Sequence, residues 1–415
     1  MPPEMIAPDP PHDEAHWRRM MYTMWLAMFF VFLEWTLGSA FVPVFLQEDM
    51  HLTLRQAEYW MGLLLALPSA AMFVAQPIWG LYADRHGRKP VVIVSVVFTS
   101  LLRSLWAFAH TPVTLLLLGI AAGALGSGVV VGQALVASTT PRERMGDAMG
   151  KLTTSMTFGF LIGPFVGQRL AAWIGPRPTF LIQALFALIG AITVWLFVQE
   201  RFVKPEPTEP VGLGAAITRD LRPLAGNRQL QALWVMAFVI FFGWSTMWPI
   251  MTLFVQTIGV PLKDVAEYAA YMMLGGGLMQ TLCAPTYGKL GDRIGHKRVL
   301  VVASCVCGVF IGLHAFVHSY AQFFLLRLCA MALGAAVNPT TSTLVAHSMP
   351  RSRYGGAYGV LASARALAGS IGPLIGGFIA AFAHIRWVFA WTGVLTLAAS
   401  LWARWAIADV RPGDA

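Results

Sequence analysis

One glutamate and three arginines interrupt the apolar runs of this sequence, and they are the first candidates for chemistry. Glu34 lies in the run FFVFLEWTLGSAF, and Arg103, Arg327 and Arg365 lie in other apolar runs. A charge at the centre of a membrane-spanning helix costs about 2.5–3.5 kcal/mol on insertion scales, so an ionisable residue there is a functional candidate by default. A carboxyl group in that position either pairs with a cation or takes up a proton. Glu34 is therefore a candidate for proton coupling, and a static ion pair between helices is the alternative.

Two short charged stretches share one pattern. GLYADRHGRKP begins at Gly80 and GKLGDRIGHKR begins at Gly288, and each follows a long apolar run. The first glycine of each stretch has no side chain, so a neighbouring helix can approach it closely. The aspartate lies just past a helix end, where its carboxylate can cap the positive N-terminus of another helix. The basic residues can bind helix-end carbonyls, the aspartate or anionic lipid. The simpler alternative is that these positive charges only set the topology.

The composition indicates a polytopic membrane protein. Of the 415 residues, 57% are hydrophobic and 12% are charged, and the mean hydropathy is +0.64; a soluble domain has about 25% charged residues. The net charge of +9 fits basic loops on the cytoplasmic side better than a nucleic-acid partner. The four cysteines lie in apolar runs, where they behave as small hydrophobes. We therefore expect no metal site, no cofactor and no nucleic acid.

Twelve apolar runs approach or exceed the about 20 residues that a membrane-spanning helix needs. They lie at roughly 20–46, 57–82, 90–110, 112–137, 151–174, 178–199, 229–257, 265–287, 298–318, 320–346, 355–383 and 386–408. We expect an N-terminal tail at 1–19, a first half at 20–199, a linker at 200–228, a second half at 229–408 and a C-terminal tail at 409–415. On the side of the termini we count 21 Lys and Arg, against 5 on the other side and 3 within spans. This asymmetry predicts that both termini are cytoplasmic.

An internal repeat divides the chain into two homologous halves. The stretch at 80–90 recurs at 288–298. PRERMGDAMG (141–150) matches PRSRYGGAYG (350–359), and IGPFVG (162–167) matches IGPLIG (371–376), both at an offset of 209. Three matches in the same order indicate a true repeat. Parallel repeats are a transporter design, with the substrate site near the midplane between the halves.

The chain resembles the major facilitator superfamily (MFS) over essentially its whole length, and within it the twelve-span multidrug and tetracycline efflux branch of drug:proton antiporters. The superfamily's loop 2–3 signature and its second-half echo match at Gly80, Asp84, Arg85, Gly87, Arg88, Lys89, Gly288, Asp292, Arg293, Gly295 and Lys297. A GxxxGPxxG antiporter signature matches at Gly159, Gly163, Pro164 and Gly167. The resemblance implies an all-α integral membrane protein with the MFS fold, in which twelve transmembrane helices form two pseudo-symmetric six-helix halves.

The resemblance also implies a latch and a shaped helix. Asp84 would cap span 11 across the interface between the halves, and Asp292 would cap span 5. Both contacts would form only when the cytoplasmic faces are closed, so they would latch the outward-facing state and break during the cycle. Pro164 would bend span 5, shape the cavity and block ion leakage, with ordinary helix packing as the alternative.

Other residues are assigned to the cavity by the same resemblance. Arg327 and Arg365 lie in spans that line or flank it, where they would hold Glu34 ionised or attract an anionic substrate. Arg103 lies in the peripheral span 3, where a structural ion pair is favoured. Gly119 stands where these antiporters usually carry an arginine, so Arg327 would take over part of the proton relay. The amphipathic and aromatic cavity candidates, for which packing is the alternative, are Trp35, Gln133, Trp244, Trp248, Gln280 and Asn338.

These features together predict a proton-driven exporter of a small organic molecule or drug. We expect it to work by alternating access in the cell inner membrane, as a monomer, with substrate, protons and membrane lipid as partners. The alternatives are a dedicated exporter of one metabolite, such as a siderophore, and a symporter for uptake. A membrane-embedded enzyme is not favoured, because the sequence contains no HExxH, no paired carboxylates and no Gly-rich phosphate loop outside the spans.

Overall fold

The computed structural model describes residues 14–140, 145–198, 200, 227–347 and 354–408. Within these ranges the chain is helical, and no strand is present. Residues 1–13 of the expected N-terminal tail, the C-terminal tail and most of the linker lie outside the described residues, whereas residues 14–19 belong to the first helix. The first half contains α1 (Glu14–Leu37), α2 (Val42–Glu48), α3 (Leu54–His86), α4 (Arg88–Ser104), η1 (Leu105–Phe108), α5 (Pro112–Leu125), α6 (Gly128–Thr139), α7 (Met145–Ile174) and α8 (Pro176–Phe197). The second contains α10 (Arg228–Met247), η4 (Trp248–Ile250), α11 (Met251–Thr257), α12 (Leu262–Ile294), α13 (His296–Leu313), η5 (His314–Phe316), α14 (Tyr320–Gly334), α15 (Val337–His347), α16 (Tyr354–Phe382) and α17 (Ile385–Ala406).

Short breaks divide several spans into two helices, so these elements form twelve spans, six in each half. Ten of them are both long enough and apolar enough to cross a membrane. The other two are α7, with 30 residues, and α12, with 33. They are long enough but carry more polar side chains. These two helices contact each other across the interface between the halves, for example where Leu161 of α7 lies against Gly277 of α12. The expected all-helical membrane fold is confirmed.

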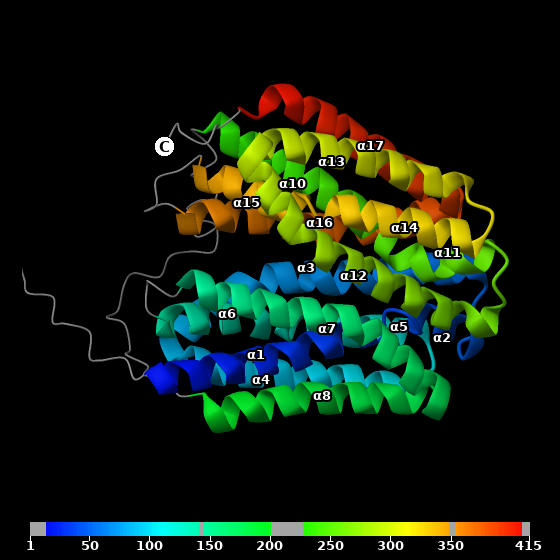
Figure 1. Ribbon diagram of the computed structural model, residues 1–415. Helices are drawn as coiled ribbons and strands as arrows, with labels where there is room; N and C mark the ends of the chain where they lie inside the picture. The colour runs from blue at the N-terminus through cyan, green and yellow to red at the C-terminus, as the bar shows by residue number, and fades with distance from the viewer. Residues whose placement is uncertain (1–13, 141–144, 199, 201–226, 348–353, 409–415) are drawn as a thin grey trace, which may run out of the picture.

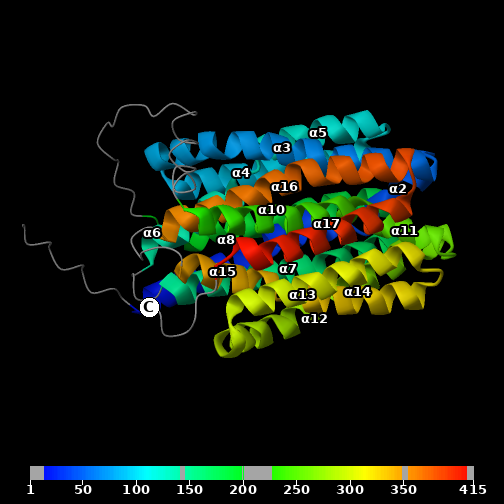
Figure 2. The same cartoon turned by 90° about the horizontal axis from the view of Figure 1, so that it is seen from above.

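The two halves lie side by side with their helices roughly parallel (Figures 1 and 2). In Figure 1, α1, α4 and α8 lie on one side of the molecule, and α10, α13 and α17 lie on the other. We call the end of the bundle that holds the α3–α4 and α12–α13 turns the motif end. The end that holds α2 and α11, at the right of Figure 1, is the opposite end.

The same contacts recur in both halves at offsets of 208 or 209 residues. Arg177 donates from Nη1 to the Ala107 carbonyl oxygen at 2.9 Å and lies over the Phe45 ring. Arg386 donates from Nη1 to the Ala315 carbonyl oxygen at 2.7 Å and lies over the Phe254 ring. The repeat seen in the sequence is therefore a structural repeat, and each half provides a control for the other.

The halves touch at the opposite end of the bundle. There Gly62 of α3 lies so close to α16 that a methyl group on it would sit 3.0 Å from the Gly377 Cα. Arg169 of α7 pairs with Glu267 of α12, with 3.1 Å between Nη2 and Oε1. The guanidinium of Arg55 also lies 5.3 Å from the centre of the Phe382 ring. These contacts close the interface at this end.

At the motif end, the same helix faces are apart. Eighteen residues, or five helical turns, separate Gly62 from Gly80, so both glycines lie on one face of α3. Among the described residues, a methyl group on Gly80 would nevertheless find no atom of another element within 4 Å. The same holds for Gly150 of α7 and Gly288 of α12. The interface is therefore closed at the opposite end and open at the motif end.

Candidate functional site

A central cavity of about 250 Å³ lies between the two halves. Its first-half lining comes from α1 and α7, and its second-half lining comes from η4, α12 and α14. The lining residues are Phe32, Met156, Thr157, Phe160, Leu161, Trp248, Met273, Gly276, Gly277, Gln280, Arg327 and Met331. Phe160 and Trp248 face each other across the interface, with 5.0 Å between their ring centres. A cavity of this kind can hold a small, largely apolar molecule.

The predicted cavity residues divide between several places. Trp248 and Gln280 line the central cavity. Gln133 donates to the sulfur of Met156, a lining residue, at 3.6 Å. The remaining three lie elsewhere: Trp35 lines a second cavity, Trp244 packs against Gly334, and Asn338 is exposed on α15.

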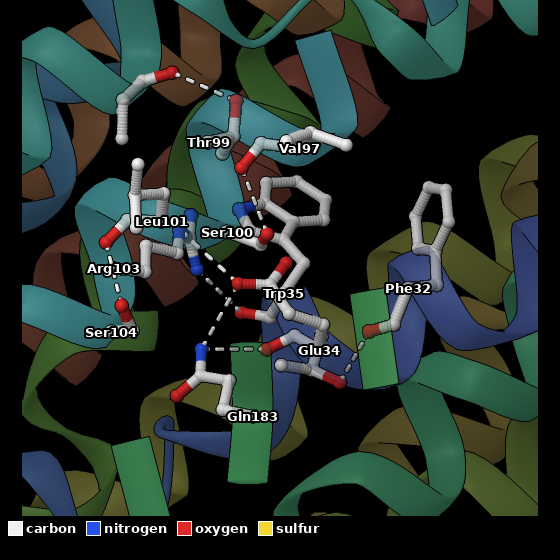
Figure 3. Close-up of polar contacts among 12 residues, drawn as sticks. Phe32, Glu34, Trp35, Val97, Thr99, Ser100, Leu101, Arg103, Ser104 and Gln183 are labelled. Carbon is white, nitrogen blue, oxygen red and sulfur yellow. Dashed lines mark hydrogen bonds and ion pairs between the residues drawn. The ribbon is translucent and has the colours of Figure 1, made fainter. Parts of the chain in front are cut away.

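Glu34 is buried in the first half, with 4% of its surface exposed. Arg103 of α4 faces it, with 3.5 Å between Arg103 Nε and Glu34 Oε1. Gln183 of α8 donates from Nε2 to Glu34 Oε1 at 3.2 Å and to the Glu34 carbonyl oxygen at 2.8 Å. Figure 3 shows the guanidinium and the amide meeting the carboxylate from two sides. We call these three residues the Glu34 cluster.

The Glu34 cluster lies beside a cavity of its own. This first-half cavity has a volume of about 270 Å³, and Glu34, Trp35, Gln76, Thr99 and Arg103 are among its lining residues. Phe32 lines both this cavity and the central one. The carboxylate and the central cavity are therefore separate sites that share helix α1.

The second half builds the same packing without charges. At the offsets that align the halves, Gly243 replaces Glu34, Ile311 replaces Arg103 and Thr392 replaces Gln183. Thr392 donates to the Gly243 carbonyl oxygen at 3.4 Å, as Gln183 does to the Glu34 carbonyl oxygen. The fold of a half thus does not need an ion pair at this position. This comparison favours a functional role for the cluster.

The partner of Glu34 is Arg103, and neither Arg327 nor Arg365 reaches it. Arg327 lines the central cavity from α14. Arg365 of α16 lies over the Phe241 ring, with 4.7 Å between its Cζ and the ring centre. The peripheral arginine of span 3 is thus the pairing residue. The sequence could not show this, because Arg103 is 69 positions from Glu34.

Gly119, where an antiporter arginine was expected, is buried in α5. A methyl group there would lie 3.1 Å from Pro68 Cγ and 3.5 Å from Trp106 Cζ2. This position has no room for an arginine as the helices pack here. At an offset of 208, its counterpart in the second half is Arg327.

The charged stretches form turns at the motif end. Gly87 and Gly295 have φ values of +96° and +95°, which glycine adopts readily, and each joins two spans. Arg88 pairs with Asp84 at 3.1 Å and donates from Nη1 to the Ala134 carbonyl oxygen at 2.8 Å. All three residues belong to the first half.

The N-termini of spans 5 and 11, which the predicted caps would contact, lie partly outside the described residues, so the caps remain a prediction. Among the described residues, the ion pair of Asp84 is with Arg88, and Asp292 pairs with His296 of its own half at 3.0 Å. Their side chains are 57% and 73% exposed. Arg85 and Arg293 are exposed in the last turns of α3 and α12. The side chains of the 350–359 loop lie outside the described residues.

Sequence reasoning missed Glu200, which caps α4. Its two carboxylate oxygens accept hydrogen bonds from the backbone N–H groups of Arg88 and Lys89, both at 2.8 Å. The Lys89 ammonium in turn donates to the Trp195 carbonyl oxygen at 2.8 Å. A carboxylate is favourable at a helix N-terminus because of the helix dipole. Glu200 therefore ties the end of span 6 to the charged stretch.

A second buried carboxyl was also missed. Glu58, in the second turn of α3, has 5% of its surface exposed. Its backbone carbonyl oxygen lies within 2.8 Å of the position a methyl group on Gly377 would take. In the sequence, Glu58 lies near the start of a helix, which suggests that its side chain is at the membrane surface. It is buried because α16 approaches α3 closely at this position.

The antiporter-type motif packs α7 against α1, the helix that carries Glu34. A methyl group on Gly159 would lie 2.7 Å from the Phe29 carbonyl oxygen, and one on Gly163 would lie 3.0 Å from the Leu33 carbonyl oxygen. Gly167 meets the Leu37 backbone in the same way. Pro164 lies within the helix and α7 continues through it. The glycines thus let two backbones touch.

The comparisons with known proteins agree with this architecture. The family model described as Major Facilitator Superfamily matches residues 24–286 and 233–415. "Multidrug resistance protein MdtG" of Yersinia enterocolitica is 28% identical over 395 residues, covering 95% of this chain and 94% of that protein. The protein of the same name from Rahnella sp. is 29% identical, covering 99% and 97%.

Solved structures show the same fold. The nucleoside transporter NupG has a TM-score of 0.77 at 13% identity, covering 94% of this chain and 100% of that one. A bacterial homologue of the lysosomal transporter Spinster, in an inward-facing conformation, has a TM-score of 0.75 at 17% identity, covering 95% and 97%. Because the family model extends over most of the sequence, the chain belongs to the Major Facilitator Superfamily.

Proposed function

We propose that this protein is a proton-coupled antiporter that exports small organic molecules, including drugs, by alternating access. The observation that carries the proposal is the central cavity, which lies where the halves are joined at one end and apart at the other. Opening and closing at alternate ends is how a two-half transporter moves its substrate past a midplane site. The names of the full-length relatives, which are multidrug resistance proteins, support export.

The proposal places the motif end and both termini in the cytoplasm. The positive-inside count supports this orientation, because the loops of the motif end carry most of the basic residues. The conformation described above is then inward-facing, and substrate enters the central cavity from the cytoplasm. We expect the protein to work as a monomer in the inner membrane. The exposed basic residues of the charged stretches would then contact anionic lipid.

We assign proton coupling to the Glu34 cluster. Protonation of Glu34 would remove its charge and release Arg103, which would weaken the contact between α1 and α4. Because α1 also packs along α7 and carries Phe32 into the central cavity, a movement of α1 caused by protonation of Glu34 would change the lining of the site where substrate binds. Substrate and proton would thus be linked through α1, while they occupy different cavities.

Transport into inverted membrane vesicles tests this assignment. An acid-inside pH gradient should drive accumulation of organic probes by the wild-type protein. Three probes of one shape are suitable: naphthalenesulfonate, naphthalenesulfonamide and trimethylnaphthylammonium. Glu34→Gln should abolish gradient-driven accumulation and retain probe binding, because the amide keeps the shape of the side chain and cannot titrate.

The control is Glu48→Gln, which removes an exposed carboxylate from the same span and should transport normally. Full gradient-driven transport by Glu34→Gln would exclude Glu34 as the coupling acid and direct attention to Glu58. A wild-type protein that moves no probe under a pH gradient, and moves one under a sodium gradient, would contradict proton coupling.

A further inference from the structure

Arg327 is a half-buried cation with no acid paired to it among the described residues. It is the one charged residue among the described residues that line the central cavity. Its Nε is buried and makes no hydrogen bond within the described part of the chain. Burying a charge without a partner is costly, so a protein keeps such a group where something else supplies the opposite charge.

The neighbours of Arg327 do not supply that charge. Among the described residues, Glu267 is the acid of α12 closest to the cavity along the helix, and it is engaged by Arg169 and by the Tyr271 hydroxyl at 2.8 Å. His314 bonds through Nδ1 to the Phe310 carbonyl oxygen at 2.7 Å, and an imidazole carries no negative charge. Within the described part of the chain no acid supplies the counter-charge, and a bound anion could supply it.

The repeat shows that packing does not require this arginine. Its counterpart in the first half is Gly119, at the same place in the fold. The first half closes that place with Pro68 and Trp106. Only the second half puts a cation there, and only there does the position face the central cavity.

The rest of the cavity suits an apolar or aromatic body. Phe32, Phe160 and Trp248 provide aromatic surface, and three methionines provide polarisable, adaptable surface. Gln280 and Thr157 are the neutral hydrogen-bonding side chains in the lining. At about 250 Å³, the cavity is near the small end of the range of ligand pockets, roughly 300–1,000 Å³.

We propose that the central cavity binds organic anions, with the acid group on Arg327 and the apolar body between Phe160, Trp248 and the methionines. The inference rests on the proposed transport function and names the substrate class of that same site. The guanidinium has a planar set of donors that matches sulfonate, phosphonate and carboxylate oxygens. An aromatic ring beside such a group would pack against Phe160 and Trp248, whose rings are tilted by 41° to each other.

Binding of the three naphthalene probes to the purified protein in lipid nanodiscs tests the proposal by calorimetry. Naphthalenesulfonate should bind the wild type at least about ten-fold more tightly than the neutral sulfonamide, since a charge-assisted hydrogen bond accounts for that much. Arg327→Gln should weaken sulfonate binding by a similar factor and leave sulfonamide binding nearly unchanged. Arg327→Lys should keep part of the preference, because it keeps the charge and loses the fork of donors.

The matched control is Arg365→Gln. Arg365 is a half-buried cation of the same half that lies against Phe241 and does not line the central cavity, so its variant should keep the preference for the anion. Equal or tighter binding of the sulfonamide or the ammonium by the wild type would overturn the proposal. So would an Arg327→Gln protein that keeps the anion preference, or a wild type that binds none of the three probes.

The two proposals fail separately. If the cavity prefers the neutral or cationic probe and vesicles still accumulate it, the anion site is wrong and the transport function stands. If the sulfonate binds through Arg327 and no probe moves under any ion gradient, the anion site stands and the transport function is wrong.

Discussion

At the scale of single residues, the sequence predicts which charged residues lie within the helices but not their partners. An ionisable residue in an apolar run stands out in the sequence, and both Glu34 and Arg327 are recognised in this way. Pairing depends on which helices pack together, and Gln183 is 149 residues from Glu34. Comparison of the two halves shows whether the fold requires the charged residues, which neither the sequence pattern nor a single distance can show. The second half reaches similar packing with neutral residues, so the fold of a half does not require these charges.

The ion pair of the Glu34 cluster leads to a stability prediction. Arg103→Gln leaves the Glu34 carboxylate buried without its cation, and breaking a buried pair in this way costs about 3–5 kcal/mol. The double variant Arg103→Gln with Glu34→Gln leaves no uncompensated charge and should be more stable than Arg103→Gln alone. The midpoint of thermal unfolding in detergent at neutral pH measures both. If the two substitutions destabilise additively, the pair is not coupled.

At the scale of helices, the turns and the glycine faces explain the two charged stretches. The sequence predicts close approach at Gly80 and Gly288, but among the described residues no other helix lies within 4 Å of a methyl group placed on either glycine. The register of the helices shows what closure would join. Leu161 of α7 lies against Gly277 of α12. Eleven residues, or about three turns, toward the motif end lead from these to Gly150 and Gly288.

The other pair of helices has the same arrangement. Gly62 of α3 meets Gly377 of α16, and eighteen residues toward the motif end lead to Gly80 and Gly359. Closure of the motif end would thus bring Gly80 toward Gly359 and Gly288 toward Gly150. In each pair, one glycine belongs to a charged stretch and the other to the second repeated loop of the other half. Both repeated loops would then take part in one close approach of the backbones.

A bulky residue at Gly288 should therefore stop the cycle without damaging the fold. Gly288→Val meets no atom within 4 Å in this conformation, so its thermal stability should match that of the wild type. Transport should fall at least about ten-fold, because the side chain would obstruct approach to Gly150. Gly163→Val is the contrasting variant, since its side chain would collide with Thr36 and the Leu33 carbonyl, and it should lower stability. Normal transport by a stable Gly288→Val protein would remove the predicted contact.

At the scale of the whole molecule, composition and repeat were enough to predict twelve helices in two halves. They did not predict which end is open, because the two conformations of such a protein share one sequence and differ only in the contacts between the halves. At the opposite end, the contacts of the described residues include glycine approaches, the Arg169–Glu267 ion pair and ring contacts. A cluster of buried apolar side chains from both halves also lies there, and these contacts would have to separate when this end opens.

Reciprocal cross-linking tests the two-state cycle directly. One cysteine pair replaces Arg169 and Glu267, whose side chains meet at the opposite end; the other replaces Gly150 and Gly288 at the motif end. The four natural cysteines (Cys283, Cys305, Cys307 and Cys329) are first changed to alanine. The opposite-end pair should cross-link readily in the resting protein, and the motif-end pair should cross-link only slowly.

Conditions that favour the outward-facing state should reverse this order, so that the motif-end pair cross-links faster than the opposite-end pair. Locking the opposite-end pair should stop transport and prevent the motif-end pair from reacting, since the two ends cannot close together around one cavity. Reduction of the disulfide should restore both transport and the reactivity of the motif-end pair. Rates at the two ends that rise and fall together, or a protein that transports with the opposite-end pair locked, would contradict alternating access. Anti-correlated rates would instead indicate a single rocking motion of the two halves about the central cavity, with the resting state open at the motif end.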